Sequence, residues 1–149
     1  MIDGIEVIDF HGHTNRNDRL RMHADADRVM HSMDAAGIDR ACVFHTGRLD
    51  GSGNERTARY AEANADRFIP FAFTSPILGK RAVEQLERAV DELHCVAIKL
   101  YPPRAPWPLH DAHWFDIYRF AHERNLAVIF HTGSEEHAHP RFLGEIAPR

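Results

Sequence analysis

Short apolar runs alternate with amphipathic segments along the whole chain. The apolar runs cover residues 5–10, 41–44, 68–73, 96–100 and 127–130. Because nearly every position within a run is apolar, we expect strands that are buried on both faces, as in a parallel sheet covered by helices.

The segments between the runs carry apolar residues at helical spacing, most clearly within 82–93 and 114–121. We expect start caps at Asp27, Asn54 and Asp111 and an end cap at Gly37. Pro70 weakens the third strand prediction, because proline has no N–H to give to the sheet.

The runs start at nearly constant spacing, about 30 residues apart, which is the size of one strand-plus-helix unit. Eight such units make the closed (β/α)₈ barrel of about 250 residues. Five runs therefore predict an α/β fold: a single domain, 1–149, of parallel (β/α) units from a TIM-like barrel, about five of eight and incomplete. An open five-stranded sheet is the alternative. Either form leaves a sheet edge through which the chain could form a homo-oligomer.

Composition narrows the class of protein. The 18 Lys and Arg residues against 22 Asp and Glu give a net charge of −4, so we do not expect a nucleic-acid partner. No window reaches the ~20 apolar residues of a membrane span, and the N-terminus lacks a basic segment before an apolar run. Cys42 and Cys95 lie in predicted strands, where free thiols pack as small apolar groups. These features predict a cytoplasmic protein.

The 12 histidines include several at the ends of apolar runs. His11 and His13 are two residues apart, which places both imidazoles on the same side of an extended chain, and Gly12 allows a turn between them. His131 ends the fifth run. Because barrel active sites form at the carboxyl ends of the strands, the three are candidate metal ligands that leave open positions for water and substrate. The alternative is that they are solvated or structural histidines.

Three strand-end motifs resemble one family. Residues 8–13 (IDFHGH), 97–103 (AIKLYPP) and 128–133 (VIFHTG) look like the first, fourth and fifth strand-end motifs of the amidohydrolase-related, metal-dependent hydrolases. The most similar branch also contains non-oxidative aromatic-acid decarboxylases. The resemblance covers the amino-terminal part of the family's barrel.

The resemblance implies His11, His13 and His131 as ligands of a divalent metal ion, with zinc expected first and manganese second. The family's catalytic aspartate follows the eighth strand, beyond the end of this chain, so we assign no catalytic residue. Lys99 matches a lysine that bridges two metals in some relatives; it could instead meet a substrate carboxylate or form an ion pair at the rim. His45 ends the second run and is a candidate to line the substrate, or a structural residue. Arg16, Arg19 and Arg21 could hold an anionic substrate, although a solvated loop is favoured.

We therefore expect a metal-dependent hydrolase that acts on a small carboxylated or cyclic molecule. A decarboxylase of the same family is the first alternative, and a truncated, catalytically incomplete fragment that self-associates is the second. A third reading is a phosphoesterase of the polymerase-and-histidinol-phosphatase type, which also begins with Asp-x-His-x-His-Thr. That class places Asp-His at the end of the second strand, where this chain has Phe44 and His45, so we favour it less.

Overall fold

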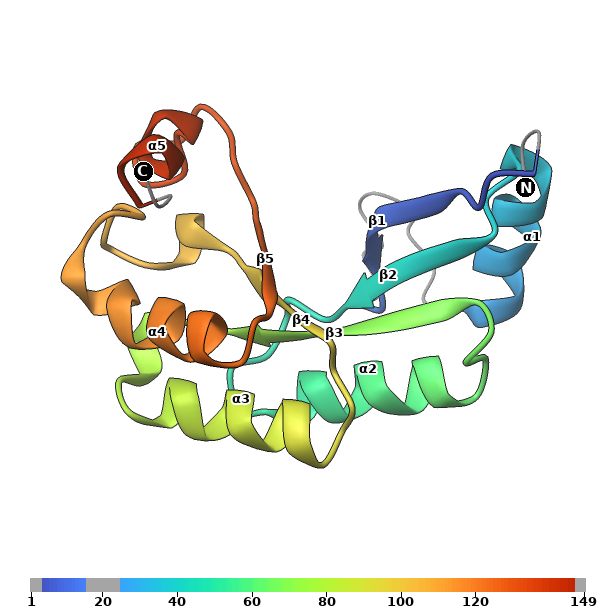
Figure 1. Cartoon of the computed structure of the whole chain (residues 1–149), viewed down its shortest axis with the longest axis horizontal. Coiled ribbons are helices and arrows are strands. Elements are labelled where there is room, and N and C mark those ends of the chain that lie inside the picture. The colour runs from blue at the N-terminus through green and yellow to red at the C-terminus, as the bar shows by residue number, and fades with distance from the viewer. Residues whose placement is uncertain (1–3, 16–24, 147–149) are drawn as a thin grey trace.

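The computed structural model describes residues 4–15 and 25–146, so the arginines at 16, 19 and 21 lie outside the described residues. Five strands form one parallel sheet in chain order, and the sheet curls (Figure 1). The strands are β1 (Ile8–His13), β2 (Arg40–Phe44), β3 (Phe68–Thr74), β4 (Ala97–Leu100) and β5 (Ala127–Phe130). This arrangement confirms the prediction of parallel (β/α) units from an incomplete TIM-like barrel.

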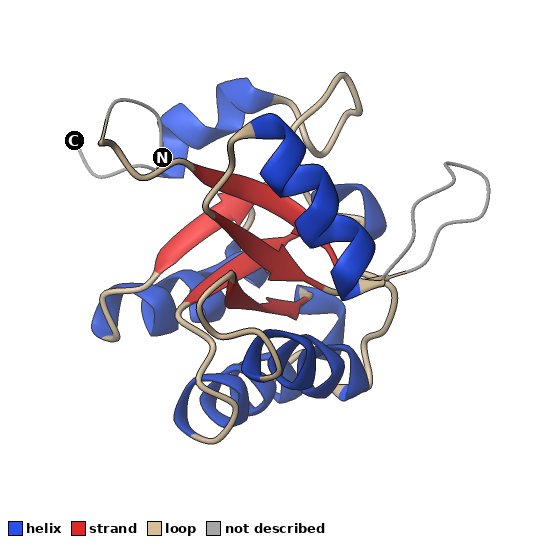
Figure 2. Cartoon of the chain, turned by 90° about the vertical axis from the view of Figure 1, so that its right-hand side faces the viewer, coloured by secondary structure: helices blue, strands red, loops and turns tan. Residues whose placement is uncertain are grey.

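Helices connect successive strands and surround the sheet (Figure 2). The α-helices are α1 (Ala26–Ala36), α2 (Ser52–Glu62), α3 (Arg81–Asp91), α4 (Phe115–Glu123) and α5 (Leu143–Ile146). Short 3₁₀ helices are η2 (Pro76–Leu78), η3 (Pro102–Arg104), η4 (Ala112–Trp114) and η5 (Pro140–Phe142). In the described part of the chain, no helix is long and apolar enough to cross a membrane.

The helix boundaries follow local capping only in part. Gly37 ends α1 in the left-handed conformation at φ 71°, as predicted, and Asp111 accepts a hydrogen bond from His113 N at the start of η4. The prediction of Asp27 as a cap was wrong: Asp25 caps α1 by accepting from Arg28 N, and Asp27 lies within the first turn.

The prediction of Asn54 as a cap was also wrong. Gly51, at φ 85°, is the N-cap of α2, and Asn54 lies inside the helix with its side chain buried. Its amide group instead forms hydrogen bonds with the backbone of Phe73 in β3. Pro70 does lie in β3, opposite Val43 of β2.

The first strand starts three residues later than predicted. Ile5 is 69% exposed and precedes β1, whereas His11 and His13 lie inside β1 at its carboxyl end. The position of β1 is set by its pairing with the neighbouring strand, since Gly12 and His13 pair with Val43 and Phe44 of β2. Apolar character alone therefore misplaced this boundary.

The two faces of the sheet carry different cores. On the outer face, Ala41 and Val43 of β2 pack with Met33 of α1 and Ala61 of α2. A larger outer cluster joins β3 and β4 to α3 and α4 and includes Leu86, Ile98, Leu100, Trp114 and Ile117.

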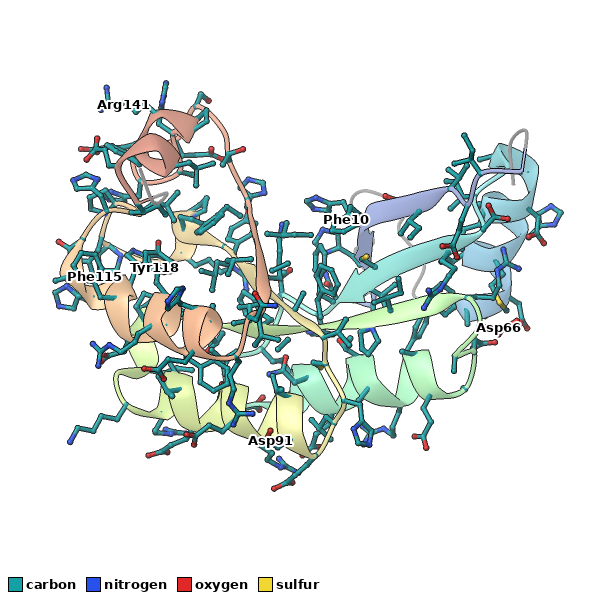
Figure 3. All side chains as sticks on the ribbon, in the orientation of Figure 1. Phe10, Asp66, Asp91, Phe115, Tyr118 and Arg141 are labelled. Atoms are coloured by element: carbon teal, nitrogen blue, oxygen red, sulfur yellow. The ribbon has the colours of Figure 1, made fainter. Side chains whose placement is uncertain are left out.

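The inner face carries a smaller cluster of Cys42, Phe44, Phe71 and Ala97. Since alternate residues of each strand serve the two cores, the strands read as continuously apolar in the sequence. In the described chain, β1 and β5 each have a neighbouring strand on one side only. Phe10 of β1, labelled in Figure 3, is 54% exposed.

Candidate active site

The first strand contains an extra residue between Asp9 and Gly12, in the stretch that includes His11. The pairing of β1 with β2 is regular at Asp9 and resumes at Gly12 after a register shift. A Cβ atom on Gly12 would lie 2.9 Å from the carbonyl oxygen of Cys42, so the close approach of the two strands requires glycine here. The resulting bulge re-aims the end of β1.

The two histidines of β1 lie side by side against one phenylalanine. The ring centroids of His11 and His13 are 5.2 Å apart, and those rings lie 5.2 and 4.8 Å from the ring of Phe44. Nδ1 of His13 is buried and has no hydrogen-bond partner in the described structure. The sequence-based expectation that both imidazoles lie on one side of the strand is therefore met in the geometry.

Burial and nearby charges favour the neutral form of both imidazoles. Burial, followed by the nearby charge of His11, lowers the pKa of His13 to about 4. Burial and the charges of Lys99 and His131 also lower the pKa of His11, while Asp9 opposes this shift. Neutral imidazole is the form that binds a metal ion.

His131 directly follows the end of β5. The nearby His131 is among the smaller causes of the lowered pKa of both His11 and His13. Its ring lies 4.4 Å from the ring of Tyr101, and its Nε2 atom is 3.9 Å from Oε1 of Glu135. His131 thus lies at the carboxyl end of β5, next to Tyr101, which follows β4.

Lys99 is the charged residue inside the sheet. Its side chain is buried completely, and Nζ lies 4.8 Å from the centroid of the Phe44 ring. In the described chain this amine has no hydrogen-bond partner. Burial lowers its pKa to about 8. The rim ion pair considered as an alternative is absent among the described residues.

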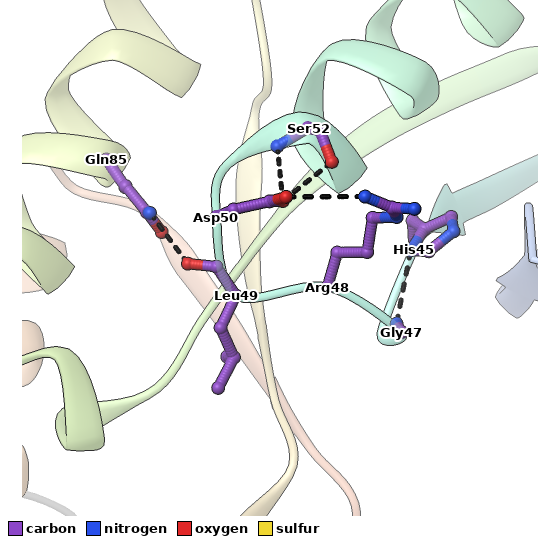
Figure 4. Close-up of polar contacts among 7 residues, drawn as sticks. All are labelled: His45, Gly47, Arg48, Leu49, Asp50, Ser52 and Gln85. Atoms are coloured by element: carbon purple, nitrogen blue, oxygen red, sulfur yellow. Dashed lines mark hydrogen bonds and ion pairs between the residues drawn. The ribbon is translucent and has the colours of Figure 1, made fainter.

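His45 is held by the loop between β2 and α2 (Figure 4). Nδ1 of His45 accepts a hydrogen bond from Gly47 N at 3.1 Å, so the proton of the neutral ring is on Nε2. A Cβ on Gly47 would lie 2.8 Å from the ring, and a Cβ on Gly53 would lie 3.1 Å from Nδ1, so the imidazole occupies a slot between two glycines. Burial, followed by the charge of Arg56, lowers the pKa of His45.

Three further contacts fix the loops around the site. Thr14 Oγ1 is 3.2 Å from Thr57 Oγ1, which ties the end of β1 to α2. Arg104, in the loop after β4, donates to the carbonyl oxygen of Thr46 and lies over the ring of Tyr101. The sequence predicted no site role for Phe44, Tyr101, Arg104 or Glu135, because only the folded chain shows that they contact site residues.

The donor set fits a metal ion in part. Two adjacent neutral imidazoles, one with a buried unpartnered nitrogen, are suitable ligands for borderline divalent ions. Over residues 4–15 and 25–146, however, no three His, Cys, Asp or Glu side chains gather closely enough to hold an ion. His11 and His13 therefore form a preorganised pair, and His131 stands near but outside it.

Parallel strands in chain order, each followed by a helical segment, with polar side chains at the carboxyl edge, define the class of (β/α)-barrel proteins. Within this class the chain belongs to the amidohydrolase family, whose family model matches residues 8–149. The match confirms the resemblance seen in the strand-end motifs. A search of curated proteins gave no match.

Solved structures share the fold at low sequence identity. A 5-carboxyvanillate decarboxylase from Novosphingobium aromaticivorans, with bound manganese and 3-methoxy-4-hydroxy-5-nitrobenzoic acid, aligns with a TM-score of 0.76 at 17% identity, over 95% of this chain and 55% of its own. A 2,6-dihydroxybenzoate decarboxylase from Rhizobium aligns with a TM-score of 0.70 at 15% identity, over 95% and 54%. A 4-oxalomesaconate hydratase from Rhodopseudomonas palustris aligns with a TM-score of 0.67 at 23% identity, over 84% and 52%. The chain thus spans about half the length of these proteins.

Proposed function

We propose that this chain forms part of a metal-dependent enzyme that acts on a small carboxylated or cyclic substrate. The observation that carries the proposal is the pair of imidazoles of His11 and His13 at the carboxyl edge of the sheet. Both rings contact the ring of Phe44, over which Nζ of Lys99 also lies. This edge is where (β/α) barrels build their active sites.

His11, His13 and His131 would hold the metal ion, with zinc expected first and manganese second. A bound divalent ion supplies Lewis acidity to a substrate oxygen. The bulge at Gly12 and the contacts of Phe44 orient the two imidazoles of β1. Lys99 is a candidate to contact the substrate or to bridge metals, and His45 is a candidate to line the substrate with its Nε2–H.

Metal content tests the ligand assignment. We expect the purified chain, after incubation with zinc or manganese and removal of excess, to retain metal measured by elemental analysis. His13→Ala should lose most of it, because one of two adjacent ligands is removed. His122→Ala, on the exposed face of α4, is the matched control and should keep wild-type content. Equal metal in the wild type and His13→Ala would contradict the assignment.

Two reaction classes are consistent with the site. Hydrolysis is the reaction expected from the sequence. Non-oxidative decarboxylation is the second candidate, favoured by the decarboxylases among the proteins of similar fold and by the buried amine of Lys99. Carboxylate-labelled 5-carboxyvanillate and 2,6-dihydroxybenzoate separate the two, because decarboxylation releases labelled carbon dioxide. Hydrolysis of an amide or cyclic substrate instead incorporates oxygen from labelled water.

Self-association is a separate candidate property. Among the described strands, β1 and β5 each leave one edge unpaired, and an unpaired edge offers backbone donors and acceptors to another chain. Light scattering coupled to size exclusion tests this directly. A monomer at all concentrations would exclude self-association through the sheet edge, while leaving the metal assignment untouched.

A further inference from the structure

The buried amine of Lys99 has no counter-charge within the described chain. Its side chain has no exposed surface, and among residues 4–15 and 25–146 Nζ has no hydrogen-bond partner and no Asp or Glu that forms an ion pair with it. An ammonium group taken out of water without a partner is costly, so folded proteins seldom retain one unless something else pairs with it.

The basic residues of this chain are strongly biased toward arginine. Lys80 and Lys99 are the only lysines among 18 Lys and Arg residues. Lys80 is exposed at the start of α3, whereas Lys99 lies in the middle of the sheet. An ammonium is a compact charge on a flexible stem, which a rigid guanidinium does not replace. The use of lysine at this buried position indicates a need for an amine.

The surroundings of Lys99 specify what could pair with it. Nζ lies over the Phe44 ring, and the same ring contacts His11 and His13. Further aromatic rings lie on the inner face, where Phe10 meets Phe71 edge-on at 5.9 Å. An anion beside a positive amine gains a charge-assisted hydrogen bond, and a flat body gains contact with the aromatic rings.

We infer that Lys99 is the carboxylate-recognition residue of this site and that it binds the carboxylate of a small planar substrate at the strand edge. The inference rests on the proposed function in taking this edge as the substrate site. Because Lys99 is covered in the present structure, its four-methylene stem must extend toward the sheet edge to reach the substrate. Lys99 thereby positions the carboxylate beside the imidazoles of β1.

Isotope-labelled lysine gives a direct test, since the chain has two lysines. With ¹³C at Cε, the wild type gives two lysine signals, and Lys80→Arg assigns the one from Lys99. Benzoate is the probe, and benzamide is its uncharged counterpart of nearly equal shape. We expect benzoate to shift the Lys99 signal in a saturable way and to leave Lys80 unshifted. Benzamide should bind at least about tenfold more weakly.

Calorimetry on variants gives a second readout. Lys99→Met should weaken benzoate binding about tenfold or more, whereas Lys80→Met should bind as the wild type does. Equal shifts with benzoate and benzamide, or no shift at Lys99 at any soluble benzoate concentration, would overturn the inference. The wild-type titration decides the question even if Lys99→Met fails to fold.

The same samples separate this inference from the metal proposal. If the wild type retains no metal but Lys99 still responds to benzoate, the recognition role stands and the metal assignment fails. If the wild type retains metal and His13→Ala loses it, but benzoate does not shift the Lys99 signal, the metal assignment stands and the recognition role fails.

Discussion

The side chain of Asn54 exchanges two hydrogen bonds with the backbone of Phe73. Nδ2 of Asn54 donates to the carbonyl oxygen of Phe73 at 3.1 Å, and Phe73 N donates to Oδ1 of Asn54 at 2.8 Å. Both bonds are buried, and they attach the first turn of α2 to β3. Because His45 lies between β2 and this helix turn, the same contact holds the wall of the candidate site.

Removing this amide should destabilise the fold. Asn54→Ala leaves the backbone N–H and C=O of Phe73 buried without partners, which should lower the free energy of unfolding by about 2–4 kcal/mol. Urea denaturation measures the change. Asn64→Ala is the matched control, since Asn64 is half-buried and no side-chain hydrogen bond is found for it in the described chain; it should cost well under half as much. Equal losses of unfolding free energy in the two variants would contradict the role of the Asn54 side chain in holding α2 against β3.

Gly12 should be intolerant of any side chain. The methyl group of Gly12→Ala would press against the carbonyl oxygen of Cys42 and the side chain of Val43, both on β2. We expect a loss of about 1–3 kcal/mol in unfolding free energy, together with weaker metal retention because the bulge aims both histidines. Gly144→Ala is the control, since nothing lies within 4 Å of its added Cβ. A Gly12→Ala protein as stable as the wild type would show that β1 can move freely.

Much of the fold could be predicted from local pattern. Runs such as 41–44 lie in strands because both faces of the sheet are covered, and Gly37 ends α1 because a left-handed residue is needed there. The start of β1 was misplaced because its position depends on pairing with β2. Asn54 was misassigned because its partner is 19 residues away in sequence, and a cap signal cannot show that.

The candidate site, like the fold, could be predicted from the sequence only where it depends on local geometry. Histidine spacing correctly placed the imidazoles of His11 and His13 on one side, since that depends on local strand geometry. The shared contact of these rings with Phe44 depends on the register of β1 against β2, and the position of Tyr101 over His131 depends on β4 against β5. The sequence contains no signal for these contacts. The roles of His11, His13, His131, Lys99 and His45 stay predictions until they are measured.

The two thiols should be unreactive in the folded protein. Burial raises the pKa of Cys95 to about 12, and burial with the nearby charge of Asp9 raises that of Cys42 to about 11. Because thiolate is the reactive form and both side chains are covered, a disulfide reagent at pH 8 should label neither residue on the timescale of its reaction with free cysteine. The denatured chain should react with two equivalents of the reagent, one for each cysteine. Rapid labelling of one thiol in the native protein would contradict the packing of that strand.

Lys99 should make the stability of the fold depend on pH near neutrality. Its folded pKa of about 8 lies below the ordinary 10.5, so between these values the unfolded chain binds more protons than the folded chain. Lys99 should therefore contribute a rise in stability of about 1 kcal/mol between pH 7 and 9. The raised pKa values of Cys42 and Cys95 oppose this rise as the pH passes the ordinary thiol value of 9.0, so the contribution of Lys99 is the difference between the wild type and a variant without the amine.

Lys99→Met tests this dependence, because methionine fills similar space without a charge. At pH 7 the variant should be more stable than the wild type by about 3 kcal/mol, and its stability should lose the rise between pH 7 and 9. Lys80→Met, at an exposed position, should follow the wild-type curve. Urea denaturation at several pH values measures all three proteins. If Lys99→Met were less stable than the wild type at pH 7, the amine would have a partner in solution and would not be an unpaired cost to folding. A stabilised variant that no longer binds benzoate would instead show that the fold gives up stability at Lys99 to keep a group for its ligand.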